Sequence, residues 1–74
     1  MGDRPHYSIV VEPLSDEDGG GFVATVPDLP GCISDGETEM EALLNVQDAI
    51  VCWLEAADER KEPYPEPTYR RAAL

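Results

Sequence analysis

Basic residues are scarce in this chain. Five lysines and arginines stand against sixteen aspartates and glutamates, which gives a formal net charge of −11 over 74 residues. Binding to a phosphate backbone requires clustered Lys and Arg, so this charge balance argues against a nucleic-acid-binding protein. The same negative field attracts and steers a basic protein partner. The alternative interpretation is that the excess acid only keeps a small protein soluble.

Cysteine and histidine are also too few for a metal site. The chain has Cys32 and Cys52, without a C-x-x-C pair, and a single histidine, His6. These residues do not complete a zinc set. We expect Cys32 to pack as a small side chain and His6 to be exposed. We also expect the protein to have no catalytic residue and no cofactor.

Long apolar runs are absent as well. No stretch has the length and apolar character of a membrane span, and residues 1–5 do not resemble the start of a signal peptide. Free thiols without an export signal predict a cytoplasmic protein with no membrane partner.

The acidic residues raise the alternative that the protein is a metal-dependent nuclease. Asp28, Asp35, Glu37 and Glu41 carry the oxygen ligands that Mg²⁺ prefers. Asp28 is better explained by turn chemistry and Glu41 by helix capping. A nuclease also needs basic residues for its substrate, so we expect no enzyme activity and no metal.

The chain length predicts a single domain over residues 1–74. A chain this short buries only about 60% of its unfolded surface, so its core is small. Such domains often gain stability by self-association, and we expect a homodimer or a higher oligomer.

Three segments have the pattern of strands. Residues 6–12 alternate, with Tyr7, Ile9 and Val11 on the face expected to meet the core, and Pro13 lies at the end. The polar, glycine-rich residues 14–21 then connect to an apolar, β-branched strand over residues 22–26. A short strand over residues 32–35 follows. The first two strands should be antiparallel, because their connection is too short for a crossover helix.

A rigid turn separates the second and third strands. Two prolines remove backbone donors, and an aspartate and a glycine supply turn chemistry. The turn and the first residue after it are Pro27, Asp28, Leu29, Pro30, Gly31 and Cys32.

The sequence contains a clear signal for the start of a helix. Thr38 is a good N-cap and Glu41 follows three residues later, so the pair predicts a capping box in which the Glu side chain reaches back to the cap amide. The helix should run over residues 39–60. Its core face should consist of Leu43, Val46, Ile50, Trp53, Leu54 and Ala57.

Further apolar residues widen that face on one side. They are Met40, Leu44 and Val51. We interpret this flank as a second contact, made either by the C-terminal segment or by another subunit. The proline-rich residues 61–67 should stop the helix in an extended path, and residues 68–74 are a candidate for a last edge strand.

The central segment resembles the signature of the HicB family of antitoxins. The matching pattern is V-P-D-L-P-G-C over residues 26–32, followed by S-x-G-x-T-x-x-E-A over residues 34–42. The resemblance covers roughly residues 7–67. It implies an α+β fold similar to a partial RNase H fold, a small antiparallel sheet of three or four strands with one long helix packed on it. The chain ends before the C-terminal DNA-binding domain of many members, so we expect no such domain and no binding to promoter DNA.

The resemblance also implies the function. HicB-like proteins bind HicA, a small basic mRNA interferase, and block its active site. We therefore expect an antitoxin-type inhibitor of a HicA-like toxin, the alternative being an orphan homo-oligomeric interaction domain without a toxin. Candidate partner-binding residues are Asp16, Glu17, Asp18, Asp28 and Asp35. For any one of them, a merely solvated carboxylate is the competing explanation.

Overall fold

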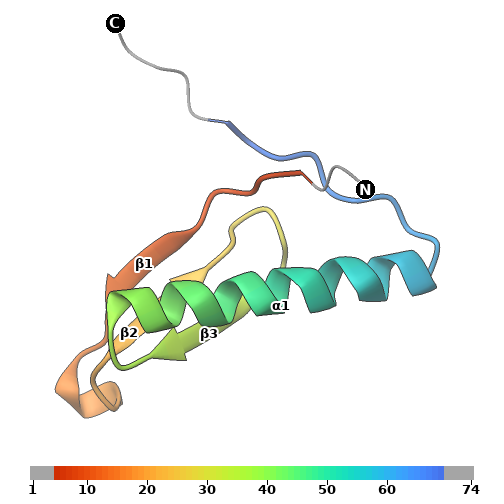
Figure 1. Ribbon diagram of the computed structural model, residues 1–74. Helices are drawn as coiled ribbons and strands as arrows, with labels where there is room; N and C mark the ends of the chain where they lie inside the picture. The colour runs from red at the N-terminus through yellow and green to blue at the C-terminus, as the bar shows by residue number, and fades with distance from the viewer. Residues whose placement is uncertain (1–4, 70–74) are drawn as a thin grey trace, which may run out of the picture.

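The computed structural model describes residues 5–69 and has an α+β architecture. A three-stranded antiparallel sheet in the order β1-β2-β3 carries one long helix, α1, across one face (Figure 1). The elements are β1 (Val10–Pro13), the short 3-10 helix η1 (Asp16–Asp18), β2 (Phe22–Thr25), β3 (Ile33–Gly36) and α1 (Glu39–Glu59). The expected fold class is confirmed, with three strands rather than four among the described residues.

The first strand begins later than its alternation predicts. Tyr7 is buried and Ile9 and Val11 pack against the core, so the predicted inward face is correct. Sheet pairing nevertheless starts only at Val10, which is the partner of Thr25. Beyond Thr25 the chain turns away, so residues 6–9 have no strand to pair with.

Residues 5–9 lie beside the C-terminal segment instead. The Tyr7 hydroxyl donates to the Pro65 carbonyl at 2.7 Å, and the Ser8 hydroxyl donates to the Thr68 carbonyl at 3.3 Å. Figure 1 shows the segment after α1 running back past the N-terminal segment. Thr68 and the residue after it are not part of a strand, and the remainder of the candidate edge strand, residues 70–74, lies outside the described residues.

The turn between β2 and β3 is closed by its own backbone. Val26 N–H donates to the Cys32 carbonyl at 3.1 Å, Leu29 N–H to Val26 at 3.0 Å, and Cys32 N–H to Leu29 at 3.0 Å. Gly31 has a φ of 81°, a left-handed conformation that glycine adopts without steric cost. The turn thereby places Leu29, only 1% exposed, in the core.

The start of α1 follows the predicted capping scheme with one difference. Thr38 is the N-cap, and its hydroxyl accepts from Glu41 N–H at 3.0 Å. The Glu41 carboxylate accepts from Glu37 N–H at 2.9 Å, one residue before the cap, so our expectation that it reaches the cap amide is wrong. Because the chain turns sharply between β3 and α1, the amide of the preceding residue is the one within reach.

Small residues allow α1 to pack closely against the sheet. The helix lies mainly over β3 and β2. A Cβ on Gly36 would come within 2.5 Å of Ala42 N, so glycine is required for this close approach. The core cluster consists of Tyr7, Ala24, Val26, Leu29, Cys32, Ala42, Val46 and Leu54. No helix among residues 5–69 combines the length and the apolar character that crossing a bilayer requires.

Candidate functional site

The sheet is covered by α1 on one face only. The register aligns Val10, Thr25 and Ile33 in one row and Glu12, Val23 and Asp35 in the next. These rows alternate with the row of the buried Ala24, so their side chains point away from the helix. We call this surface the open sheet face and define it as Val10, Glu12, Val23, Thr25, Ile33 and Asp35.

Three of the six side chains of the open sheet face are apolar. Ile33 is 57% exposed and Val10 is 40% exposed, while Val23 between the edge strands is half-buried. A shallow hollow of roughly 310 Å³ is lined by Leu14, Val23, Ile33, Ser34 and Asp35. A large exposed aliphatic side chain beside a hollow is the arrangement that protein-binding surfaces use for anchoring.

Carboxylates gather at one end of this face. Asp35 lies beside the glycine-rich connection, where a second, polar hollow of about 600 Å³ is lined by Gly19, Gly20, Gly21, Asp35, Gly36, Glu37 and Glu41. The exposed η1 residues belong to the same connection, and Ser15 Oγ donates to Asp18 Oδ2 at 2.8 Å. We call Glu12, Asp16, Glu17, Asp18, Asp35 and Glu37 the acidic end.

No lysine or arginine of the described residues offsets these charges. Within residues 5–69 the only Lys and Arg side chains are Arg60 and Lys61, which follow the C-terminal end of α1. A helix of 21 residues is about 30 Å long. Since that distance exceeds the Debye length at physiological salt, no lysine or arginine within residues 5–69 opposes the charge of the acidic end.

Asp28 is not part of this cluster. It lies in the β2–β3 turn at the opposite end of the sheet, where its carboxylate accepts from Thr68 N–H at 2.8 Å and from the Thr68 hydroxyl at 3.0 Å. The structure therefore brings Asp16, Glu17, Asp18 and Asp35 to one end and separates Asp28 from them. Asp28 holds the C-terminal segment against the turn.

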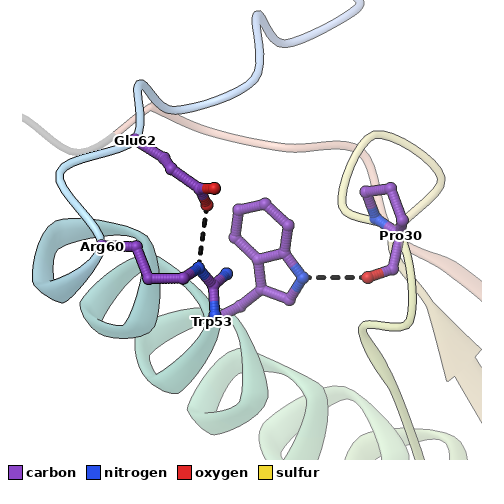
Figure 2. A network of polar contacts seen from close by, with 4 residues as sticks. All are labelled: Pro30, Trp53, Arg60 and Glu62. Atoms are coloured by element: carbon purple, nitrogen blue, oxygen red, sulfur yellow. Dashed lines mark hydrogen bonds and ion pairs between the residues drawn. The ribbon is translucent and has the colours of Figure 1, made fainter.

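The rest of the turn is anchored internally. Trp53 reaches from α1 and donates its indole N–H to the Pro30 carbonyl at 2.9 Å, as Figure 2 shows. Arg60 and Glu62 form an exposed ion pair at 2.9 Å on the same side of α1, a type of contact that contributes little to stability. Burial raises the pKa of the Cys32 thiol, which keeps it protonated and disfavours a nucleophilic role.

The candidates named from the sequence did not include Glu12 and Ile33, which lie on the open sheet face, or Leu14, which lines its hollow. The alternation over residues 6–12 already placed Glu12 on the face away from the core. Alternation in the third strand likewise separates Ile33 from the buried Cys32. No group of three or more His, Cys, Asp or Glu side chains within residues 5–69 is arranged to hold a metal ion.

A second apolar surface lies on the helix. Met40, Leu44 and Val51 are 64%, 55% and 42% exposed, and with Gln47 they form one stripe, which we call the helix flank. The flank adjoins a hollow of roughly 250 Å³ between α1 and the N-terminal segment, which includes Ile9 and Ile50. Residues 61–69 leave the flank exposed. Of the two contacts that we expected there as alternatives, the C-terminal segment or another subunit, the first is therefore not made by the described part of the segment.

Comparisons with known proteins agree on one family. The family model described as the HicB-like antitoxin of bacterial toxin–antitoxin systems matches residues 7–72. A UPF0150 protein of Thermoplasma acidophilum is 39% identical over 59 residues, covering 80% of this chain and 81% of that protein. A UPF0150 protein of Synechocystis is 38% identical over 60 residues, covering 81% of this chain and 78% of that protein.

One longer relative comes from a virus. An uncharacterised 14.9 kDa protein of Haemophilus phage HP1 is 42% identical over 60 residues, which are 81% of this chain but only 42% of the phage protein. No solved structure matches the chain at a significant level.

Proposed function

The chain belongs to the HicB-like antitoxin family of bacterial toxin–antitoxin systems, and from that premise we propose that it binds and occludes a HicA-like mRNA interferase. The proposed inhibition is steric and takes place in the cytoplasm, without chemistry or a cofactor of its own. The three antiparallel strands followed by one helix support a partial RNase H-like fold.

The observation that carries the proposal is the acidic end, which no lysine or arginine of residues 5–69 opposes, beside an apolar surface. A ribonuclease must present a positive surface to hold RNA phosphates. An acidic protein that covers this surface competes directly with RNA, and the opposite fields raise the association rate. Charge alone gives little specificity, so apolar anchors next to the carboxylates are also required.

The same charge distribution disfavours direct binding of nucleic acid. With a net charge of −11, the chain repels a phosphate backbone at long range. We therefore propose that the protein acts on the toxin rather than on the toxin's RNA substrate or on promoter DNA.

We also propose that two copies associate through the helix flank. The four residues of the stripe carry no charged side chain, so two flanks can pack together with the neighbouring Asp48 and Glu55 at the border of the contact rather than at its centre. The open sheet face lacks this property, because Glu12 and Asp35 lie on it. The neutral flank is therefore the better surface for a second copy of an acidic chain.

The test of the inhibitor function is co-expression with the small basic product of the adjacent reading frame. We expect the two proteins to co-purify, and RNA cleavage and growth arrest by the basic protein to be suppressed. Failure to co-purify, together with undiminished cleavage, would refute the inhibitor function and leave the homo-oligomeric interaction domain as the better description.

A further inference from the structure

We propose that the open sheet face is the surface on which the toxin docks, with Ile33 as its apolar anchor. This inference rests on the proposed function and adds the location of the interface. The expected occupant is a basic protein surface that offers an apolar pocket or patch flanked by Lys and Arg side chains.

The apolar component is concentrated at Ile33. At 57% exposure it is the most exposed aliphatic side chain of the sheet, and it borders the hollow that Leu14 and Val23 line. Val10 lies in the same row, two strands away. An aliphatic side chain that becomes buried in a partner favours binding in proportion to the apolar area that it removes from water.

The charges on the face select the kind of partner. Glu12 and Asp35 stand in the row next to Ile33, and the acidic end continues beyond them into η1. A second copy of this chain would bring the same carboxylates into opposition, and RNA would bring phosphates. A basic protein is the occupant whose charge complements this face.

The free edge of β3 is partly blocked, so a partner is expected to dock on the open sheet face rather than to add a strand to the sheet. Val26 and Cys32 form a hydrogen-bonded pair of the β2–β3 ladder. Hydrogen-bonded and non-hydrogen-bonded pairs alternate along an antiparallel ladder, so the N–H and C=O groups of Ile33 and Asp35 point away from β2, toward the free edge of β3. The Asp35 carbonyl already accepts from the Asn45 side chain at 2.8 Å. This contact from α1 blocks continuous strand pairing at the edge, while the side chains on the open sheet face stay accessible.

Isoleucine methyl signals test the proposal on the unaltered protein. The chain has three isoleucines, Ile9, Ile33 and Ile50. Ile9 and Ile50 line the hollow beside α1, on the other face of the sheet. The probe is the basic product of the adjacent frame, inactivated at its catalytic residue and titrated into methyl-labelled protein. We expect the Ile33 signal to shift or broaden, and the Ile9 and Ile50 signals to change little.

Two substitutions give an independent measurement by calorimetry. Ile33→Lys should raise the dissociation constant at least about tenfold, because it removes the anchor and adds a charge that repels a basic surface. Glu55→Gln is the matched control, since it changes the net charge by the same amount on the exposed far side of α1. We expect it to bind within about twofold of the original chain, because a distant exposed charge has little effect. Thermal melts check that both variants fold.

Asp35→Asn tests the charge component against the same control. Its association rate should fall and become less sensitive to salt, while the dissociation rate changes less. Glu55→Gln makes the same carboxylate-to-amide change away from the face and should leave the association rate nearly unchanged.

The outcomes separate the two proposals. Toxin binding with an unchanged Ile33 signal and an unaffected Ile33→Lys variant overturns the docking surface and leaves the inhibitor function standing. A shift of the Ile33 signal with protein concentration alone, without toxin, assigns the face to self-association and also overturns it. A protein that neither binds nor inhibits the toxin overturns the inhibitor function, and the docking surface with it.

Discussion

Replacing Gly31 with alanine isolates the backbone cost of the turn between β2 and β3. Gly31 has a φ of 81°, and a Cβ built on it meets no atom within 4 Å. The substitution therefore creates no clash, and its whole effect comes from holding an L-residue in a left-handed conformation. That conformation costs about 1–2 kcal/mol for a residue with a side chain.

The expected change is large enough to measure. For a domain of this size, 1 kcal/mol shifts the melting temperature by roughly 4–8 °C, so Gly31→Ala should melt about 4–16 °C lower. Trp53 is the single tryptophan of the chain and its indole bonds the carbonyl of Pro30, the residue before Gly31. Its fluorescence therefore follows loss of the turn directly. Protein concentration must be held fixed, because self-association would change the melting point.

Gly31→Asn is the matched control for the conformational argument. Asparagine occupies the left-handed region more readily than alanine, so it should lose less stability although its side chain is larger. A melting point within about 1 °C of the original for Gly31→Ala, or an asparagine variant as unstable as the alanine variant, would contradict the strain argument.

Three further predictions concern the helix and the N-terminal segment. Thr38→Ala should cost about 1 kcal/mol of unfolding free energy in a urea titration by removing the cap to Glu41 N–H, whereas Thr38→Ser, which keeps the hydroxyl, should cost less. Burial first, and then the charges of Asp28, Glu66 and Tyr69, raise the pKa of Tyr7 above its usual 10.0. The stability from this shift is present below pH 10 and is lost as the pH rises through the folded-state pKa, so Tyr7→Phe should show a shallower alkaline decline in urea titrations. Leu44→Lys should weaken self-association in light scattering on dilution, while Glu17→Gln, which changes the net charge by the same amount in η1 and away from the flank, should not.

Local chemistry made the helix start and the turn predictable. The Thr38 cap depends on residues within one helical turn, and the Pro27–Gly31 bend depends on prolines and a glycine that restrict their own backbone. Both features appear where the sequence predicts them. The inward face of residues 6–12 was predictable for the same reason, because alternation is a local property.

The candidate site required information that is not local. The sequence grouped Asp28 with Asp35 because both flank the turn along the chain, but Asp35 lies at the far end of β3 and Asp28 bonds Thr68. Only the strand register shows that Asp35 and Glu12 lie in one row of the sheet, on either side of Val23. Alternation placed Glu12 on the outward side of its own strand, but only the assembled sheet shows that Ile33 and Asp35 share that side.

The two exposed apolar surfaces belong to different layers, and this separation bears on how the protein could act. The helix flank lies on α1, whereas the open sheet face points away from it (Figure 1). A second copy on the flank would leave Ile33 uncovered, and a toxin on the sheet would leave Leu44 uncovered. Because the charges lie on the sheet face and the flank stripe is neutral, each surface also discriminates against the other's partner. On our proposals, self-association and toxin binding are therefore compatible, and a dimer would present both of its sheet faces to basic partners at once.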